Sequence, residues 1–170
     1  MSLPARCAAL ALGGNLGAPA QAFADALAQM EAGGNVRVRA RSQVWRTPPW
    51  GKTDQPDFLN MAALIETDLD PHALLDLCLS LEQRAGRMRA ERWGPRTLDI
   101  DVIAFANVRM DDARLVLPHP RAHERAFVLA PLAEIAPALV LHGRRVDALA
   151  ATVDRAGMNV DAAATRIVLR

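Results

Sequence analysis

The hydrophobic pattern of the chain switches between a two-residue repeat and a three-to-four-residue repeat, and each switch marks a predicted element. Residues 36–45 alternate apolar side chains with arginines, which is typical of a half-exposed strand. Residues 71–86 begin with proline and repeat leucine or cysteine at helical spacing, which predicts an amphipathic helix. The predicted strands are residues 7–12, 36–45, 58–67, 98–105 and a weak final one at 167–169. The predicted helices are residues 19–32, 71–86, 127–135 and 146–156.

Prolines and glycines separate these elements. Residues 47–56 hold three prolines, a glycine and a tryptophan, so we expect an irregular loop there. Strands and helices are mixed without the strict alternation of a doubly wound sheet, which favours a layered α+β fold. Neither an internal repeat nor a linker interrupts the pattern, and we expect residues 1–170 to form one domain.

Two aspartates share one face of the predicted strand at residues 98–105. Asp99 and Asp101 alternate with apolar residues, so their carboxylates lie roughly 6–7 Å apart. Carboxylates this close repel each other, and a divalent cation would relieve the repulsion. Oxygen ligands of this kind suit Mg²⁺, which completes its shell with water and phosphate. An edge strand with a solvated polar face explains the same spacing, and the spacing alone leaves both interpretations open.

Arginines gather just before this strand. Their planar, permanently charged groups match phosphate oxygens, so arginines beside paired carboxylates suggest magnesium–nucleotide chemistry. The glycine-rich stretch at residues 13–17 has no lysine near it and does not match a phosphate loop, and we interpret it as a tight turn. The arginines are Arg84, Arg87, Arg89, Arg92 and Arg96.

An aromatic residue and an amide share a face of another predicted strand. Phe58 and Asn60 are two positions apart, so a flat heterocycle could stack on the ring and pair with the amide. A core phenylalanine followed by a capping asparagine is the more ordinary explanation. His119 and His123 have no cysteine or further histidine at zinc spacing, which argues against a zinc site.

Composition narrows the class of protein. The net charge of this 170-residue chain is +1, which argues against a nucleic-acid-binding module or a nuclease built on the same arginines and aspartates. A purely structural domain would leave the paired aspartates unexplained. Cys7 and Cys78 lie in apolar segments and fit reduced, buried thiols of a cytoplasmic protein. The apolar run at residues 7–12 is too short for a signal peptide or a membrane span.

Together these segments resemble the 6-hydroxymethyl-7,8-dihydropterin pyrophosphokinase family of folate biosynthesis. The resemblance runs from about residue 8 to residue 140, and its most specific part is Arg-Trp-Gly-Pro-Arg-Thr-Leu-Asp-Ile-Asp at residues 92–101. It strengthens the metal interpretation of the aspartate pair. The matching segments are residues 11–17, 46–49, 54–60, 91–101, 117–119 and 125–127.

The resemblance implies a three-layer α-β-α domain around an antiparallel sheet with a ferredoxin-like core. It also implies transfer of diphosphate from ATP to the hydroxymethyl group of the reduced pterin, with release of AMP and a need for two Mg²⁺ ions. The expected partners are small-molecule substrates, with no nucleic acid and no membrane, and we expect a monomer in the cytoplasm. No residue of the sequence stands out as a general base.

Site residues follow from the resemblance position by position. The metal ligands would be Asp99 and Asp101, and the catalytic phosphate contacts Arg87, Arg89 and Arg96. The ATP site would include Leu75, Glu82, Trp93, Val102, Arg114, His119 and Arg125. The pterin site would include Thr47, Pro48, Trp50, Phe58, Asn60 and Phe127. Residues 86–91 form a shorter segment than is common in the family, so the choice between the first two arginines as the contact to the reacting phosphate stays open.

Overall fold

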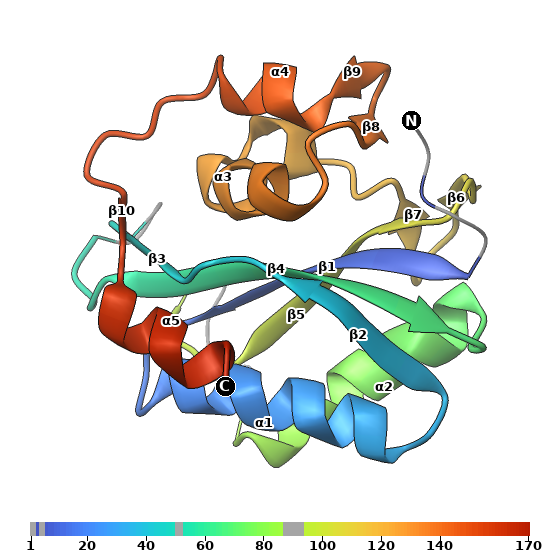
Figure 1. Cartoon of the computed structure of the whole chain (residues 1–170), viewed down its shortest axis with the longest axis horizontal. Coiled ribbons are helices and arrows are strands. Elements are labelled where there is room, and N and C mark those ends of the chain that lie inside the picture. Colours follow the sequence, from blue (N-terminus) through green and yellow to red (C-terminus); the bar gives the residue numbers. More distant parts are fainter. Residues whose placement is uncertain (1–2, 4–5, 50–52, 87–93) are drawn as a thin grey trace.

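The protein is built as a central sheet between two layers of helices (Figure 1), in a computed structural model that describes residues 3, 6–49, 53–86 and 94–170. The main sheet holds β1 (Cys7–Gly14), β2 (Val36–Arg41), β3 (Trp45–Thr47), β4 (Phe58–Thr67), β5 (Asp99–Phe105) and β10 (Asn159–Val160). The helices are α1 (Pro19–Ala32), α2 (Pro71–Arg84), α3 (Ala126–Ile135), α4 (Val146–Ala150) and α5 (Ala162–Val168). In the described ranges, none of the helices has the length and apolar character needed to cross a membrane.

The strands follow the order β10-β3-β4-β1-β5, with β2 pairing to the same strand β4 as β3 does, and every pairing is antiparallel. Along the chain, β1-α1-β2-β4-α2-β5 is a β-α-β-β-α-β unit in which β1 lies between β4 and β5. This is the arrangement of a ferredoxin-like core, so the predicted fold class is confirmed. Two small hairpins, β6 (Met110–Asp111) with β7 (Val116–Leu117) and β8 (Val140–Leu141) with β9 (Arg144–Arg145), and the 3-10 turn η1 (Ala122–Glu124) complete the structure.

The two faces of the sheet support two separate hydrophobic cores. On β1, Leu10 and Leu12 point towards the layer of α1, α2 and α5, where Phe23 is fully buried. Ala9 points the other way, into the core that α3 and α4 cover. The alternation of side chains along a strand therefore assigns each strand residue to one helical layer. Figure 1 shows α3 and α4 on one side of the sheet and α1, α2 and α5 on the other.

The predicted single strand at residues 36–45 is wrong, because the structure divides it into β2 and β3. Between them, the backbone N–H of Ser42 donates to Ala62 O (2.9 Å), and its hydroxyl accepts the N–H of Ala62 (2.8 Å). The Ser42 hydroxyl thus takes the place of a backbone carbonyl as the acceptor for Ala62, and the regular pairing with β4 is interrupted here. A register shift between Val38 and Ala40 adds to the break.

The C-terminal predictions also need correction. The helix expected over residues 146–156 ends at Ala150, and the weak strand expected at residues 167–169 is instead the end of α5. The Asp161 carboxylate accepts the N–H of Ala164 (2.9 Å) and so caps the helix. Ala164 and Val168 are one helical turn apart and both are buried in the core. Helical spacing, rather than alternation, explains these apolar positions.

Candidate active site

The face of the sheet towards α3 carries a polar row built from three adjacent strands. Asn60 of β4 pairs with Gly13 of β1, which pairs in turn with Asp99 of β5. Two positions back along β1, Ala11 pairs with Asp101. Directly opposed residues project to the same face of a sheet, so the amide and both carboxylates flank the two small residues of β1.

Gly13 is required by the position of the Asn60 amide. A Cβ atom at Gly13 would lie 2.9 Å from Asn60 Oδ1, closer than carbon and oxygen can approach without a shift. Asn60 is buried and its Nδ2 donates to Thr47 Oγ1 (2.8 Å), while Phe58 lies two positions earlier on the same face. Thr47 and the flat surface at Gly13 therefore fix the orientation of the amide beside an aromatic ring.

Asp99 and Phe58 are connected through one arginine. The Arg96 guanidinium forms an ion pair with Asp99, and its Cζ lies 5.5 Å from the centroid of the Phe58 ring. Arg96 Nε is buried and has no hydrogen-bond acceptor among the described residues. Since a buried donor without an acceptor costs free energy, this N–H is a ready contact for an anionic ligand.

Asp101, two positions further along β5, also has an arginine neighbour that lies over an aromatic ring. Arg125 places Nη1 3.5 Å from Asp101 Oδ2 and Cζ 5.7 Å from the centroid of the Phe127 ring. His119 approaches the same carboxylate, with Nε2 4.0 Å from Asp101 Oδ2. The structure thus gathers two aspartates, two arginines and two aromatic rings of the predicted site on one face.

The backbone of the segment before α3 positions His119. Its N–H donates to Ile103 O (2.8 Å), which holds the residue beside β5. Burial, and to a lesser extent the charge of Arg125, lower the pKa of His119 to about 4. The imidazole is therefore neutral at pH 7 and adds a hydrogen-bonding group, rather than a charge, beside Asp101.

Asn15 joins three parts of the site and was not among the predicted site residues. Its Nδ2 donates to Pro56 O (3.0 Å) and Gln55 Oε1 (3.1 Å), and its Oδ1 accepts the backbone N–H of Arg96 (2.9 Å). Asn15 is buried, with 8% of the residue exposed. Asn15 therefore ties the segment before Phe58 to the segment before the aspartates.

The glycine-rich stretch at residues 13–17 has a different role from the predicted tight turn. Gly13 and Gly14 belong to β1, and only Gly17 adopts the left-handed conformation of a turn (φ 65°). A Cβ atom at Gly14 would lie 2.5 Å from Thr97 O, so this glycine permits the close approach of the arginine segment to β1. A run of two glycines at the end of an apolar strand was the only sequence signal for this contact.

Known proteins resemble this chain in sequence over most of its length. A model of the 7,8-dihydro-6-hydroxymethylpterin-pyrophosphokinase (HPPK) family matches residues 9–137. The chain belongs to the HPPK family. The 2-amino-4-hydroxy-6-hydroxymethyldihydropteridine pyrophosphokinase of Methylorubrum extorquens is 52% identical over 149 residues, covering 88% of this chain and 94% of the relative. The enzyme of the same name from Bacillus subtilis is 40% identical over 151 residues, covering 89% and 87%.

Solved structures support the HPPK fold. The wild-type HPPK-DHPS of Plasmodium falciparum matches with a TM-score of 0.63 and 13% sequence identity, over 85% of this chain. This chain spans 40% of that longer protein. At this identity the likeness is one of fold, and it agrees with the ferredoxin-like core described above.

Other predicted ATP residues lie on or near α2, or on the face of β5 that points towards α2. Glu82 is buried and its Oε1 accepts the backbone N–H of Ile100 (2.7 Å), between the two aspartates. Val102 and Leu75 contribute to the core on the α2 side of the sheet. Arg114 pairs with Asp76 at the exposed end of this region. These HPPK-family positions remain predictions as nucleotide contacts.

Four predicted site residues lie outside the described part of the chain, so their HPPK-family roles also remain predictions. They are Trp50, Arg87, Arg89 and Trp93. Thr47 and Pro48 come directly before the first of these gaps, and Thr47 is buried against Asn60.

The donor set on this face fits Mg²⁺. Across the described ranges, no three His, Cys, Asp or Glu side chains converge into a protein cage for a metal. Asp99 and Asp101 are partly exposed, at 20% and 37%, and each carboxylate has an arginine as its positive partner. Two partly exposed carboxylates with arginines beside them suit a magnesium–phosphate complex, because Mg²⁺ keeps water and phosphate as its other ligands.

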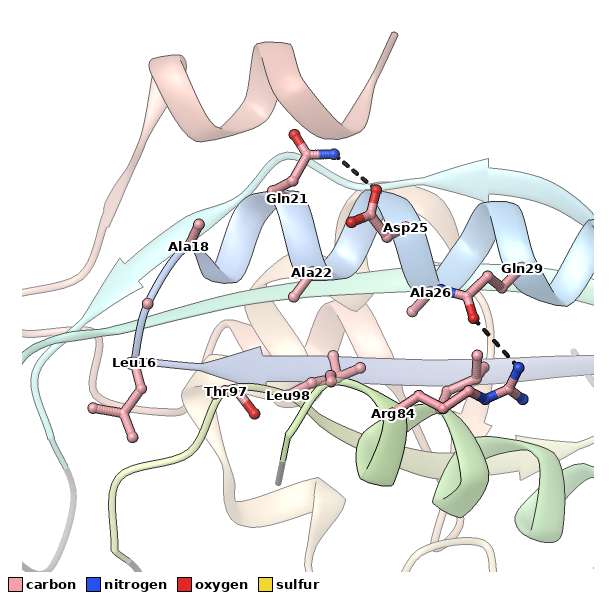
Figure 2. Close-up of a pocket in the computed structure, with 13 residues that line it drawn as sticks. Leu16, Ala18, Gln21, Ala22, Asp25, Ala26, Gln29, Arg84, Thr97 and Leu98 are labelled. Atoms are coloured by element: carbon pink, nitrogen blue, oxygen red, sulfur yellow. Dashed lines mark hydrogen bonds between the residues drawn. The ribbon is translucent and has the colours of Figure 1, made fainter. Parts of the chain in front are cut away.

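A cavity of about 310 Å³ lies on the opposite side of the sheet, between α1 and the end of α2 (Figure 2). Its rim is polar: Gln21 Nε2 donates to Asp25 (2.8 Å), and Arg84 Nη1 donates to Gln29 (3.4 Å). Among the predicted metal, ATP and pterin residues that the structure describes, none lines this cavity. The candidate active site on the α3 face is therefore separate from this cavity.

Replacing Asn15 with alanine should loosen the site and destabilise the fold. Loss of its buried hydrogen bonds should lower the free energy of unfolding by about 1–3 kcal/mol. Urea unfolding measures this loss, and amide hydrogen exchange should become faster at Arg96, whose N–H loses its acceptor. The exposed Asn107→Ala is the matched control. Unchanged exchange at Arg96 in Asn15→Ala would show that Asn15 does not hold this segment.

Proposed function

We propose that this chain transfers the terminal diphosphate of ATP to the hydroxymethyl group of 6-hydroxymethyl-7,8-dihydropterin and releases AMP, as a step of folate biosynthesis. The single observation that carries the proposal is the row Asn60–Gly13–Asp99 across three strands. This row brings the Asn60 amide and the Asp99 carboxylate to one face, with no bulky side chain between them, which supports an amide that binds the heterocycle beside a carboxylate that binds the metal. Membership of the HPPK family supports the same reaction.

The pterin is proposed to bind at the β4 end of this row. The half-buried Phe58 ring offers a stacking surface, and Asn60 offers both a donor and an acceptor to the heterocycle edge. Phe127 would cover the other face, and Thr47, Pro48 and Trp50 would close the pocket. Adjacent strands lie about 4.8 Å apart, so Asn60 and Asp99 are separated by roughly 10 Å, which a bicyclic ring with a one-carbon arm can bridge.

The triphosphate is proposed to bind at the β5 end. Arg96 and Arg125 supply fixed positive charge, and the unpartnered Nε of Arg96 supplies a donor that needs no rearrangement. Arg87 and Arg89 would add contacts to the reacting phosphate. The rest of the nucleotide would be surrounded by the other predicted ATP residues, which are Leu75, Glu82, Trp93, Val102, Arg114 and His119.

Asp99 and Asp101 are the residues proposed to hold two Mg²⁺ ions. When bound, Mg²⁺ would neutralise phosphate oxygens and make the β-phosphorus a better electrophile. Arg96 and Arg125, which pair with these aspartates, would then be available to pair with phosphate oxygens. Because phosphoryl-type transfer has a loose transition state, the contribution of the protein is alignment and charge stabilisation. Phe58 and Asn60 orient the pterin so that its hydroxyl faces the phosphorus in line.

The experiment that tests the proposal is direct. Incubation of the protein with ATP, Mg²⁺ and the reduced pterin alcohol should produce AMP and the pterin diphosphate in equal amounts, resolved by chromatography. Release of ADP, or no dependence on the pterin, would contradict the proposal. We expect the activity in a cytoplasmic monomer that acts on these small molecules alone.

Removing either metal-ligand carboxylate should abolish turnover. Asp99→Asn and Asp101→Asn should each lower kcat at least about 100-fold, since charge stabilisation of the transferred group is lost. Asp68→Asn, which removes an exposed ion pair with Arg6, is the control and should leave the rate unchanged. Circular dichroism confirms that the variants are folded. Near-wild-type rates with Mg²⁺ as the sole divalent ion would refute the metal assignment.

Replacing Phe58 with alanine should act on one substrate. Loss of the ring should weaken pterin binding by about 1–3 kcal/mol, the scale of a lost aromatic contact with its burial. The affinity for ATP should change much less. Calorimetric titration with each ligand separates the two effects, and equal losses for both would mean that Phe58 supports the fold rather than the pterin.

A further inference from the structure

The C-terminal segment 157–168 connects the two helical layers along the outer edge of β3. Figure 1 shows the chain leaving α4, passing β3 at β10 and ending in α5, which lies with α1 on the other side of the sheet. This segment follows the region that the family model matches, residues 9–137. Its contacts nevertheless return to residues 41–48, which lead into the proposed pterin pocket.

β3 is too short to hold its own position. It has three residues, pairs with β4 on one side, and ends at Thr47, whose hydroxyl accepts the Asn60 amide. Pro48 follows directly and is exposed. Any displacement of β3 therefore moves Thr47 and Pro48 relative to Asn60. We refer to these three residues as the pterin wall.

The C-terminal segment completes the other edge of β3. Asn159 and Val160 pair with Arg46 and Trp45, and the N–H of Asp161 donates to Val44 O (2.8 Å). The N–H of Val44 in turn donates to Thr165 Oγ1 (2.9 Å) in α5. The backbone of residues 44–46 is thus held by a strand and by a helix that come from the same segment.

The Asp161 carboxylate joins these two supports. One oxygen accepts the N–H of Ala164 (2.9 Å) and caps α5, and the other pairs with Arg46 Nη2 (2.5 Å). α5 is anchored in turn by Val168, which is fully buried in the core beneath the sheet. Through this carboxylate, the core fixes the position of a β3 residue immediately before Thr47.

Gly157 touches the pterin wall itself. A Cβ atom at this glycine would lie 2.8 Å from Pro48 Cγ, and the proline ring has little freedom to move away. The backbone here is left-handed (φ 75°), so glycine is favoured on two grounds. The turn that starts the C-terminal segment therefore lies directly against Pro48.

We propose that Gly157 and Asp161 are positioning residues that hold the pterin wall from outside the active site. The inference rests on the proposed function, since the wall has this role only if the pterin binds there. A segment that served stability alone would affect both substrates equally when loosened. A positioning segment should affect the pterin selectively, because its contacts reach Arg46, directly before Thr47, and Pro48. Among the described residues, no hydrogen bond or ion pair joins this segment to Asp99 or Asp101.

The first test compares two glycine substitutions with the same backbone strain. Gly157→Ala and Gly143→Ala both force alanine into a left-handed conformation (φ 75° and 81°), but at Gly143 a Cβ atom would meet nothing within 4 Å. In the AMP-release assay, Gly157→Ala should raise KM for the pterin at least about fivefold, with KM for ATP within about twofold of wild type. Gly143→Ala should change neither KM.

The second test removes the charge of Asp161 and keeps its size. Asp161→Asn should raise KM for the pterin in the same selective way, because asparagine still caps α5 but no longer pairs with Arg46 as a charge. Asp147→Asn is the control, since Asp147 also pairs with an arginine, Arg145, and accepts a backbone N–H, from Ala148. It lies in α4 and should leave both KM values unchanged. This variant decides the question if Gly157→Ala does not fold.

The outcomes distinguish a failure of the proposed function from a failure of the positioning role. If wild-type protein forms no AMP with the pterin, the proposed function fails and the positioning role falls with it. If wild type is active and the Gly157 and Asp161 variants match their controls in KM for the pterin, the positioning role is wrong and the proposed function stands. A selective rise in both variants supports the inference, and equal rises for both substrates overturn it.

Discussion

The candidate active site depends on two small residues of β1. They lie between the polar residues of β4 on one side and those of β5 on the other. Gly13 and Ala11 occupy the central positions of the row, and a larger residue at Gly13 would push the Asn60 amide away. β1 cannot move aside, because its other face carries Leu10 and Leu12 into the main core. The same strand therefore provides a packed face and a bare face, and the bare face leaves space between the Asn60 amide and the two aspartates.

Each aspartate on this face has a positively charged partner in the protein. Asp99 is paired with Arg96, and Asp101 has Arg125 and a neutral His119 beside it. Both arginines also lie over aromatic rings, which limits the orientations of the guanidinium groups. Under the proposed function, two Mg²⁺ ions would be new positive partners for the aspartates, and the triphosphate would be a new negative partner for the arginines. Each group that loses its present ion-pair partner would therefore gain another of the same sign.

Local patterns in the sequence predicted those parts of the site that depend on one element. The two-residue spacing of Asp99 and Asp101 and of Phe58 and Asn60 gives each pair a shared face, as the structure shows. Asn15 was missed because its partners are about 40 and 81 positions away, at Gln55 and Arg96. Such contacts arise only when the strand order is known, and residue type alone does not indicate it.

The fold shows the same division between local and distant causes. Long periodic elements such as α1 and β4 were predicted with the bounds that the structure has, or nearly so. The C-terminal residues 167–169 were too few to distinguish alternation from helical spacing, and burial against α1 decides for a helix. The break between β2 and β3 depends on Ser42 reaching Ala62 in another strand. In each case a tertiary contact outweighs a weak local preference.

The buried carboxylate of Glu82 has a consequence for association between copies of the chain. β5 is the last strand on its side of the sheet, and an outer strand with free N–H groups invites pairing with another molecule. Glu82 takes the N–H of Ile100 from α2, at the position between the two aspartates. At Ile100, between the two aspartates, the edge of the sheet is thereby closed by the protein's own helix. The partly exposed carboxylates of Asp99 and Asp101 can thus remain on an edge strand that is blocked at this position as a template for aggregation.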